Sequence, residues 1–199
     1  MSTAIQKSFD ERRTMRKSRE QAAETRKRIV RAAARAFREK GIVATSLADL
    51  MKAAGMTHGG FYRHFASKDQ LIAEACAEAT QELMERMETQ PTINAAVAGY
   101  LSTRHRDTPG SGCPFSTIGS ELARTDEKTR QVATAAFERL VGLLAGNSKE
   151  KDARRRALVA ASTMIGAVTM SRVVTDPGLS AEILRAAEKS LGRISRDGS

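Results

Sequence analysis

Apolar side chains recur every three or four positions along most of the chain, which is the spacing of one face of an α-helix. The clearest case is the stretch 24–40, which Gly41 ends in the C-cap position. Its apolar stripe consists of Ile29, Val30, Ala33, Ala34 and Phe37. Ala, Arg, Glu and Leu are abundant, and aromatic residues make up only 4% of the chain. Because unbranched side chains lose little rotamer freedom on a helix, the sequence predicts an all-α fold.

Glycine, proline and short polar clusters divide this pattern into about nine helices. They are expected at 24–40, 47–54, 57–65, 68–88, 92–106, 115–124, 127–145, 151–174 and 180–194. Residues 1–20 carry mixed charge and few apolar anchors, so they are expected to form either a flexible arm or a frayed helical extension.

Positive charge is concentrated in the first third of the chain. The formal net charge is +10, and residues 1–68 hold 16 Lys and Arg against 6 Asp and Glu, whereas the remaining basic and acidic residues cancel. A charge run is often only a solvated helix face, but this complete segregation favours a surface for a polyanion. We therefore divide the chain into a basic N-terminal arm (1–23), a DNA-binding unit (24–67) and a helical body (68–199).

Two short helices meeting near Gly55 have the layout of a helix-turn-helix. On the second of them, Phe61 and Phe65 are four residues apart and must face the core, while His58, Tyr62 and Arg63 lie on the other side. A recognition helix has this division, because its outer face and N-terminus meet base edges in the major groove.

The Gly59-Gly60 pair lies inside this second helix. Each glycine costs a helix about 1 kcal/mol relative to alanine. Missing side chains are useful where the backbone approaches another surface closely, and a DNA groove is such a surface. The alternative is that this segment is a loop.

Several polar residues near the helix-turn-helix are candidates for DNA contact. His58 can donate or accept a hydrogen bond at a base edge, and Tyr62 can donate to a phosphate. Others lie at helix starts or ends, where phosphate contacts are common; these are Thr45, Thr57, His64 and Lys68. For His64, an ordinary half-buried histidine capping its own helix is the simpler interpretation.

About fifty residues around this motif resemble the tetracycline-repressor family of regulators. The matching positions are Thr25, Arg26, Ala33, Phe37, Gly41, Thr45, Leu50, Ala54, Gly55, the run from Gly59 to Phe65, Ser67, Lys68 and Leu71. The resemblance implies phosphate contacts by Thr45, Thr57, Tyr62, His64 and Lys68, and base contacts by His58, Gly59 and Gly60. His58 stands where a lysine or another polar residue is frequent in the family, so the base preference of the family does not carry over to this chain. Arg63 stands at a position that is often aromatic, and it is included as a DNA contact whose role is open.

The last two helices carry apolar stripes that could pair two copies of the chain. The stripes are Leu158, Ala161, Ile165, Val168 and Arg172, with Gly166 allowing close approach, and Ile183, Leu184, Ala187 and Leu191. Internal core is the alternative for both stripes. The family resemblance favours a homodimer in which these helices form an intersubunit four-helix bundle, bound to a palindromic operator.

The body between these regions would hold a small-molecule effector. The candidate lining residues are Met84, Tyr100, His105, Cys113, Phe115 and Phe137, although such residues at helical spacing are more often plain core. Cys113 begins a helix, where the dipole can lower a thiol pKa, so a redox- or electrophile-sensing repressor is an alternative. Cys76 is interpreted as a buried small hydrophobe.

No catalytic or metal-binding motif stands out. We therefore expect neither an enzyme nor a cofactor. With no signal peptide or membrane span in view, we expect a cytoplasmic, effector-released repressor. A non-specific nucleic-acid-binding protein remains a further alternative.

Overall fold

The computed structural model describes the backbone of residues 2–146 and 152–194, with side chains except those at 2–18, 58, 193 and 194. Within these ranges the chain forms nine α-helices, two short 3-10 helices and no strand, so the all-α prediction is confirmed. The elements are α1 (Ser2–Lys40), α2 (Leu47–Ala53), η1 (His58–Arg63), α3 (Lys68–Glu88), α4 (Ile93–Tyr100), α5 (Thr103–Asp107), η2 (Pro109–Ser111), α6 (Phe115–Leu122), α7 (Glu127–Ala145), α8 (Ala153–Val173) and α9 (Pro177–Ile194).

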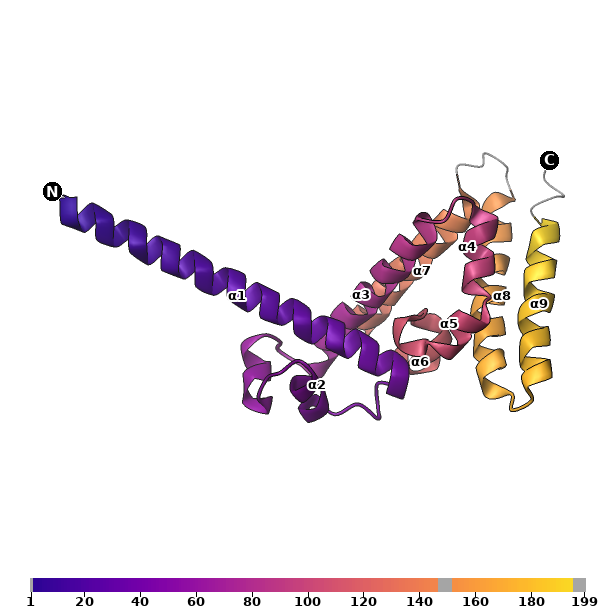
Figure 1. The fold of residues 1–199 in the computed structure, drawn as a ribbon, viewed down its shortest axis with the longest axis horizontal. Coiled ribbons are helices and arrows are strands. Elements are labelled where there is room, and N and C mark those ends of the chain that lie inside the picture. Colours follow the sequence, from indigo (N-terminus) through magenta and orange to yellow (C-terminus); the bar gives the residue numbers. More distant parts are fainter. Residues whose placement is uncertain (1, 147–151, 195–199) are drawn as a thin grey trace.

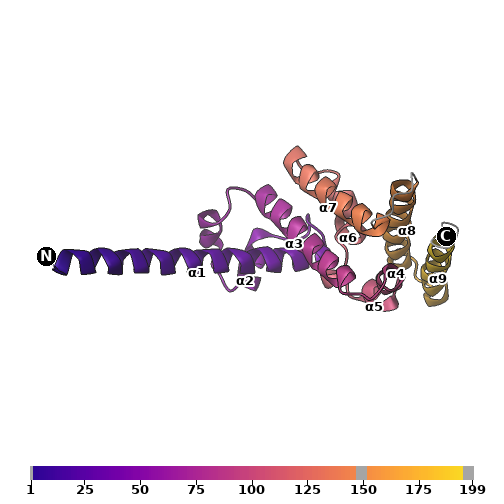
Figure 2. The same cartoon turned by 90° about the horizontal axis from the view of Figure 1, so that it is seen from above.

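Helix α1 is the longest element and begins at Ser2, well before the expected start near residue 24. Of the two possibilities for residues 1–20, the structure has the helical extension over 2–20, continuous with the rest of α1. Figures 1 and 2 show its N-terminal half projecting away from the other helices. The segment 2–23 contains neither glycine nor proline and is rich in residues of high helix propensity, so nothing in it stops the helix.

Two expected helices differ in the structure. The single helix predicted over 92–106 is divided into α4 and α5, because the Ser102 hydroxyl accepts a hydrogen bond from the backbone N–H of His105 (3.2 Å) and starts a new helix. The helix predicted over 57–65 is the 3-10 helix η1. Short 3-10 segments commonly serve as connectors, and the two glycines lower the tendency of this segment to form an α-helix.

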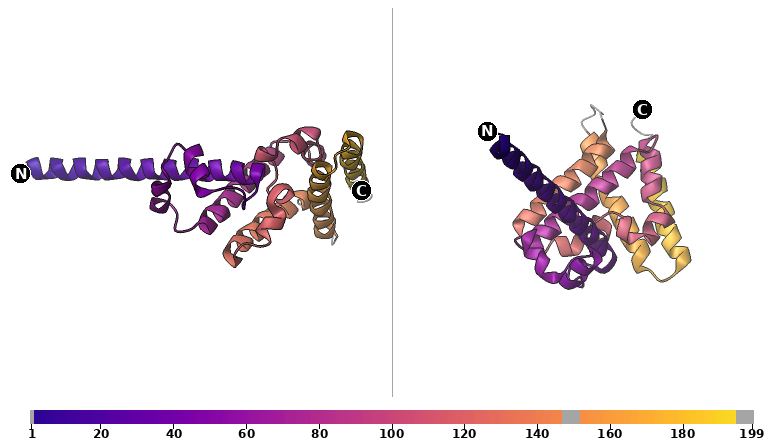
Figure 3. Two further views of the ribbon diagram at one scale, coloured as in Figure 1. Left: turned by 90° about the horizontal axis from the view of Figure 1, so that it is seen from below. Right: turned by 60° about the vertical axis from the view of Figure 1, so that its left-hand side comes forward.

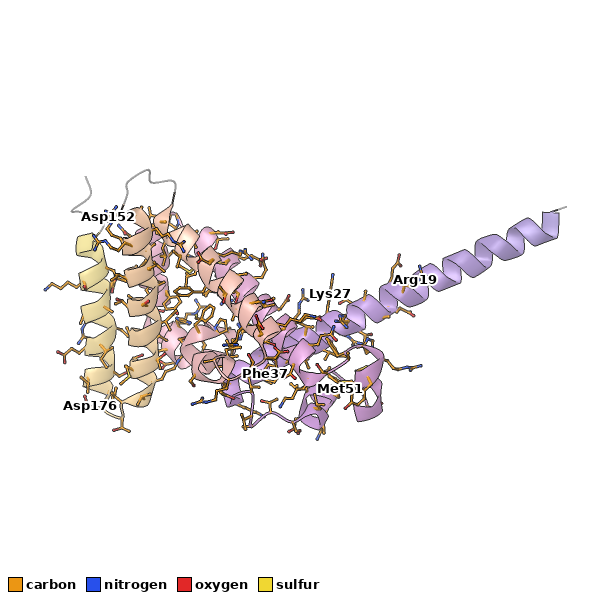
Figure 4. The ribbon with its side chains drawn as sticks, turned by 180° about the vertical axis from the view of Figure 1, so that it is seen from behind. Arg19, Lys27, Phe37, Met51, Asp152 and Asp176 are labelled. Carbon is orange, nitrogen blue, oxygen red and sulfur yellow. The ribbon has the colours of Figure 1, made fainter. Side chains whose placement is uncertain are left out.

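The DNA-binding unit has its own hydrophobic core, formed by α1, α2, η1 and the first half of α3. Phe37, Phe61 and Phe65 are almost completely buried there, together with Leu50 and Met51. Figure 4 shows Phe37 and Met51 at this end of the molecule. Ile118 and Leu122 of α6 also join this core, so the body contacts the unit directly.

A second core holds the body together. It is built from the second half of α3 and from α4, α7, α8 and α9, with Met84, Leu140, Met164, Val168 and Leu184 buried at its centre. Because α3 contributes to both cores, it connects the two parts of the molecule. Helices α8 and α9 pair at the end opposite the projecting part of α1 (Figure 3).

No helix in the described part of the chain combines the length and apolar character needed to cross a bilayer.

Candidate DNA-binding face and buried polar cluster

The helix-turn-helix is held by its caps and by two stacked phenylalanines. The Ser46 hydroxyl accepts a hydrogen bond from the N–H of Asp49 (3.1 Å) at the start of α2. Gly55 follows α2 with a φ of +71°, a left-handed conformation that glycine adopts without strain. Phe61 and Phe65 stack with their ring centroids 5.4 Å apart, and these two buried rings attach η1 to the core.

The opposite side of η1 faces solvent. Tyr62 is 68% exposed, and Thr57, Gly59 and Arg63 are exposed as well. A Cβ added at Gly59 would meet nothing within 4 Å, and one at Gly60 would make only ordinary contacts. Packing within the chain therefore does not require either glycine. The side chain of His58 lies outside the described residues.

Two predicted phosphate contacts are engaged in holding the loop between α1 and α2. Thr45 is buried, and its hydroxyl donates to the carbonyl of Gly41 (2.6 Å). The Lys68 ammonium donates to the carbonyls of Ile42 and Thr45, both at 2.9 Å. These contacts fix the loop that positions α2.

Arg26 of α1 fixes η1 from the other side, a role that sequence reasoning missed. Its guanidinium lies 4.2 Å from the centroid of the Phe65 ring, donates to the carbonyl of His64 and pairs with the Glu74 carboxylate of α3. One side chain thus ties α1, η1 and α3 together. The only signal in the sequence is the place of Arg26 in the family-like motif.

In the body, three of the predicted effector residues form one cluster. The His105 ring accepts a hydrogen bond from the backbone N–H of Cys113 at Nε2 (2.9 Å), so its other nitrogen, Nδ1, donates to the carbonyl of Tyr100 (2.6 Å). Tyr100 and His105 also pack edge to face, with centroids 4.5 Å apart. Burial lowers the pKa of His105 to about 4, so the ring is neutral at pH 7.

Tyr100 and Cys113 are both buried within this cluster. Tyr100 is 4% exposed, and its hydroxyl meets no hydrogen-bond partner. Burial raises its pKa well above the usual value. Cys113 is fully buried, and burial also raises the pKa of its thiol despite nearby donors. A buried thiol of raised pKa is a poor nucleophile, which weighs against the redox-sensing alternative. Burial likewise raises the pKa of Cys76, to about 11, as its interpretation as a small hydrophobe implies.

The remaining predicted effector residues lie in the same region. Met84 is buried in the second core. Phe115 and Phe137 pack against that core and edge to face with each other, with their ring centroids 5.8 Å apart. The structure therefore gathers all six candidates, from α3, α4, α5, α6, α7 and the segment before α6.

The stripes predicted for the dimer surface lie inside the protomer, which corrects that prediction. Ala161, Val168 and Leu184 are almost completely buried, and Arg172 points inward. The others, Leu158, Ile165, Ile183, Ala187 and Leu191, belong to or pack against the second core. The repeat of apolar residues marks the face of α8 that is buried inside the protomer against α7 and α9. A surface that pairs two copies must therefore use another face of α8. Only Gly166 is on the exposed side.

The exposed side of α8 is a different stripe. Val159, Met170 and Val173 are 48%, 49% and 65% exposed, and Leu179 of α9 is 45% exposed. Gly166 lies between them, and a Cβ there would meet nothing within 4 Å. We call these five residues the α8 stripe.

Segment η2 joins the buried cluster to the DNA-binding unit, a link that sequence reasoning also missed. Arg38 of α1 is 5% exposed and donates to the carbonyl of Gly112 (3.0 Å), while pairing with Glu82 of α3 (2.8 Å). Arg86 of α3 donates to the carbonyl of Ser111. The end of α1 is therefore clamped to the segment that leads to Cys113.

Comparison with known sequences gives matches to both parts of the chain. Residues 29–75 match the sequence model of the bacterial regulatory proteins of the tetR family, and residues 91–189 match that of the LmrA/YxaF-like transcriptional regulator C-terminal domain. The HTH-type transcriptional regulator TtgR of Pseudomonas putida is 45% identical over 58 residues, which are 29% of this chain and 28% of TtgR. The HTH-type transcriptional regulator Rv0196 of Mycobacterium tuberculosis is 28% identical over 170 residues, covering 76% of this chain and 86% of that protein.

Solved structures show the same fold. A TetR transcriptional regulator from Chloroflexus aurantiacus matches with a TM-score of 0.70 and 28% identity, over 86% of this chain and 94% of that one. The reduced form of Escherichia coli NemR matches with a TM-score of 0.68 and 18% identity, over 84% of this chain and 95% of that one.

Proposed function

Because this chain belongs to the TetR family of transcriptional regulators, we propose that it is a sequence-specific DNA-binding repressor that a small-molecule effector releases from its operator. The observation that carries this proposal is the two-sided character of η1. Its phenylalanines fix it to the core, while Tyr62, Arg63 and Thr57 are exposed beside a glycine pair that internal packing does not need. A surface of this kind suits close approach to a DNA groove.

The predicted DNA contacts then divide into three groups. Thr57, Tyr62, Arg63 and His64 contact the DNA backbone, and His58, Gly59 and Gly60 face the bases. Thr45 and Lys68 act by holding the loop between α1 and α2, since their polar atoms already bond to its carbonyls. The basic helical extension of α1 adds positive charge on the same unit.

Tight binding requires two copies of this unit, because one short recognition element makes few base contacts. We assign the pairing surface to the α8 stripe. It is apolar and exposed, and its glycine lets a second helix approach closely. A two-fold dimer built on it would read a palindromic operator with half-sites about 34 Å, or a multiple of this, apart.

Two connections would carry the signal from effector to DNA. Helix α3 belongs to both cores, and η2 is clamped to α1 through Arg38 and to α3 through Arg86. An effector that binds better to a body with η2 displaced would move α1 and thereby change the separation of the two recognition elements.

The test begins with a binding site selected from random duplex DNA by the purified protein. We expect affinity for the selected site to exceed that for a scrambled site at two salt concentrations. Equal affinity for both, with a steep salt dependence, would establish the non-specific alternative instead.

Variants then distinguish residues that contact DNA from residues that hold the DNA-binding unit in place. Tyr62→Phe should lower affinity for the selected site roughly tenfold by removing one hydrogen bond to a phosphate, with thermal stability unchanged. Lys68→Met should lower both affinity and stability, because it leaves two loop carbonyls without their donor. Lys189→Met, at an exposed position of α9, is the control and should change neither.

A further inference from the structure

The buried cluster in the body contains a hydroxyl, that of Tyr100, that forms no hydrogen bond within the folded chain. The Tyr100 hydroxyl is enclosed and has no partner, although buried polar groups are nearly always hydrogen-bonded. Its nearest polar groups are the hydroxyl of Ser116 and the thiol of Cys113, which act on its pKa as hydrogen-bonding groups but do not lie in hydrogen-bonding geometry with it. An unpartnered buried hydroxyl costs stability, so a ligand that accepts its hydrogen bond would recover that cost on binding.

The half-buried cation of Arg172 lies near this hydroxyl, because its guanidinium bonds to the hydroxyl of Ser116, which is also a neighbour of Tyr100. The Arg172 guanidinium donates from Nη1 to the hydroxyl and the carbonyl of Ser116 (both 3.1 Å), from Nη2 to the carbonyl of His105 (2.8 Å) and from Nε to the carbonyl of Arg106 (2.9 Å). All these acceptors are neutral, and among the described residues no carboxylate lies within ion-pair distance of Arg172. Burial lowers the pKa of Arg172, and the charge of Asp107 partly opposes this shift.

The surroundings of these two groups are apolar. Met84, Leu140 and Met164 are almost completely buried in the same core, and Phe115 and Phe137 pack against it. Methionine side chains are flexible and adapt to ligands of different shape. His105 is neutral at pH 7, so the cation that bonds within this cluster is Arg172, and the Asp107 carboxylate is close enough to act on the pKa of Arg172.

From these observations we infer that the effector is an amphipathic monoanion, whose carboxylate or similar acidic group takes the Tyr100 hydroxyl and the Arg172 guanidinium while its apolar part lies among the methionines and phenylalanines. The inference rests on the proposed function, since it names the effector class of that repressor. It also explains how binding reaches α1. When Arg172 turns toward the anion it gives up carbonyls of His105 and Arg106, and these residues precede η2.

The first experiment compares anions with neutral molecules of the same shape. Benzoate, naphthoate and octanoate, each beside its primary amide, are titrated into the full-length protein by calorimetry. At least one carboxylate should bind roughly tenfold or more tightly than its amide, because a charge-assisted pair with arginine is open only to the anion. If none of the carboxylates binds, or if the amides bind equally well, the inference is wrong.

Tyr100→Phe provides the sharper test, because it removes only the hydroxyl that has no partner. The variant should unfold at the same temperature as the wild type or higher, yet bind the carboxylate about tenfold more weakly. Undiminished affinity in this variant would overturn the assignment of Tyr100.

Arg172→Gln should abolish the preference for the carboxylate, with Arg185→Gln, an exposed arginine of α9, as the control. If Arg172→Gln does not fold, Tyr100→Phe decides alone.

Measuring DNA binding beside carboxylate binding shows whether the effector class or the proposed repressor function is wrong. A wild-type protein that binds its selected DNA site but none of the carboxylates remains a repressor and contradicts the effector class. A protein that binds a carboxylate through Tyr100 but discriminates no DNA sequence supports the ligand site and contradicts the repressor.

Discussion

At the scale of single residues, His105 joins two separate pieces of backbone and can do so only while it is neutral. Its ring donates to the carbonyl of Tyr100 and accepts from the N–H of Cys113. Protonation would place a second hydrogen on the ring and turn the acceptor into a donor facing another donor. Arg172 and Arg86 also oppose a positive charge at this position.

Stability should therefore fall as the pH drops from about 6.5, the ordinary pKa of histidine, toward the folded value of about 4. In this window the unfolded chain binds a proton that the folded chain does not, which favours unfolding. The loss from His105 between pH 7 and pH 5 should be about 2 kcal/mol, measured by urea unfolding.

His105→Gln is the comparison, because an amide can also donate and accept. It should be less stable than the wild type at pH 7 by about 1 kcal/mol but should lose less stability at pH 5. Identical pH dependence in the two proteins would show that His105 does not titrate as described.

At the scale of elements, the short helix η2 packs closely against the end of α1. A Cβ added at Gly110 would lie 2.3 Å from Oε1 and 2.7 Å from Cγ of Glu39. Glycine is favoured there by the closeness of the exposed Glu39 side chain, about seventy residues earlier in the sequence, and not by an unusual backbone conformation.

Gly110→Ala should therefore lower the free energy of unfolding by about 0.5–1 kcal/mol, because the Glu39 side chain must turn away and lose its ion pair with Arg35. Gly142→Ala in α7 is the matched control. A Cβ there meets nothing within 4 Å, so helix propensity should raise stability by about 0.5–1 kcal/mol and leave DNA affinity unchanged. Chemical unfolding and DNA titration of both variants check this, and a Gly110→Ala protein equal to the wild type would show that the contact is easily relieved.

At the scale of the whole molecule, α2 lies well away from α8 and α9, which form the end opposite the projecting part of α1 (Figure 1). In the α8 stripe Val159, Gly166, Met170 and Val173 are exposed on α8, and Leu179 is half-exposed near the start of α9. Two copies joined there would place their recognition elements far apart on either side of a two-fold axis, as a palindromic DNA site requires.

Met170→Glu should convert the dimer to a monomer in sedimentation equilibrium, since pairing would bring two carboxylates into an apolar contact. Affinity for the selected DNA site should fall at least roughly tenfold as well. Val43→Glu is the control for oligomeric state, because Val43 is 86% exposed but lies on the loop after α1. A Met170→Glu protein that remains dimeric would place the pairing surface elsewhere.

Local patterns determined a large part of this structure. Helical periodicity with caps such as Ser46 and Ser67 was enough for the all-α fold and for the positions of most helices, because these signals act within a few residues. The spacing of Phe61 and Phe65 was likewise enough to separate the buried and exposed faces of η1. The family-like motif indicated the kind of protein before any tertiary contact was known.

Tertiary structure decided which groups meet and which apolar face stays exposed. Periodicity shows that α8 has an apolar stripe, but only packing against α7 and α9 reveals that Ala161 and Val168 are core while Val159 and Met170 are exposed. The contacts of Arg26 with Phe65, of Arg38 with Gly112 and of Arg172 with Ser116 join residues about forty to seventy positions apart. Such contacts depend on how helices pack against one another, a property of the whole chain that no local pattern contains.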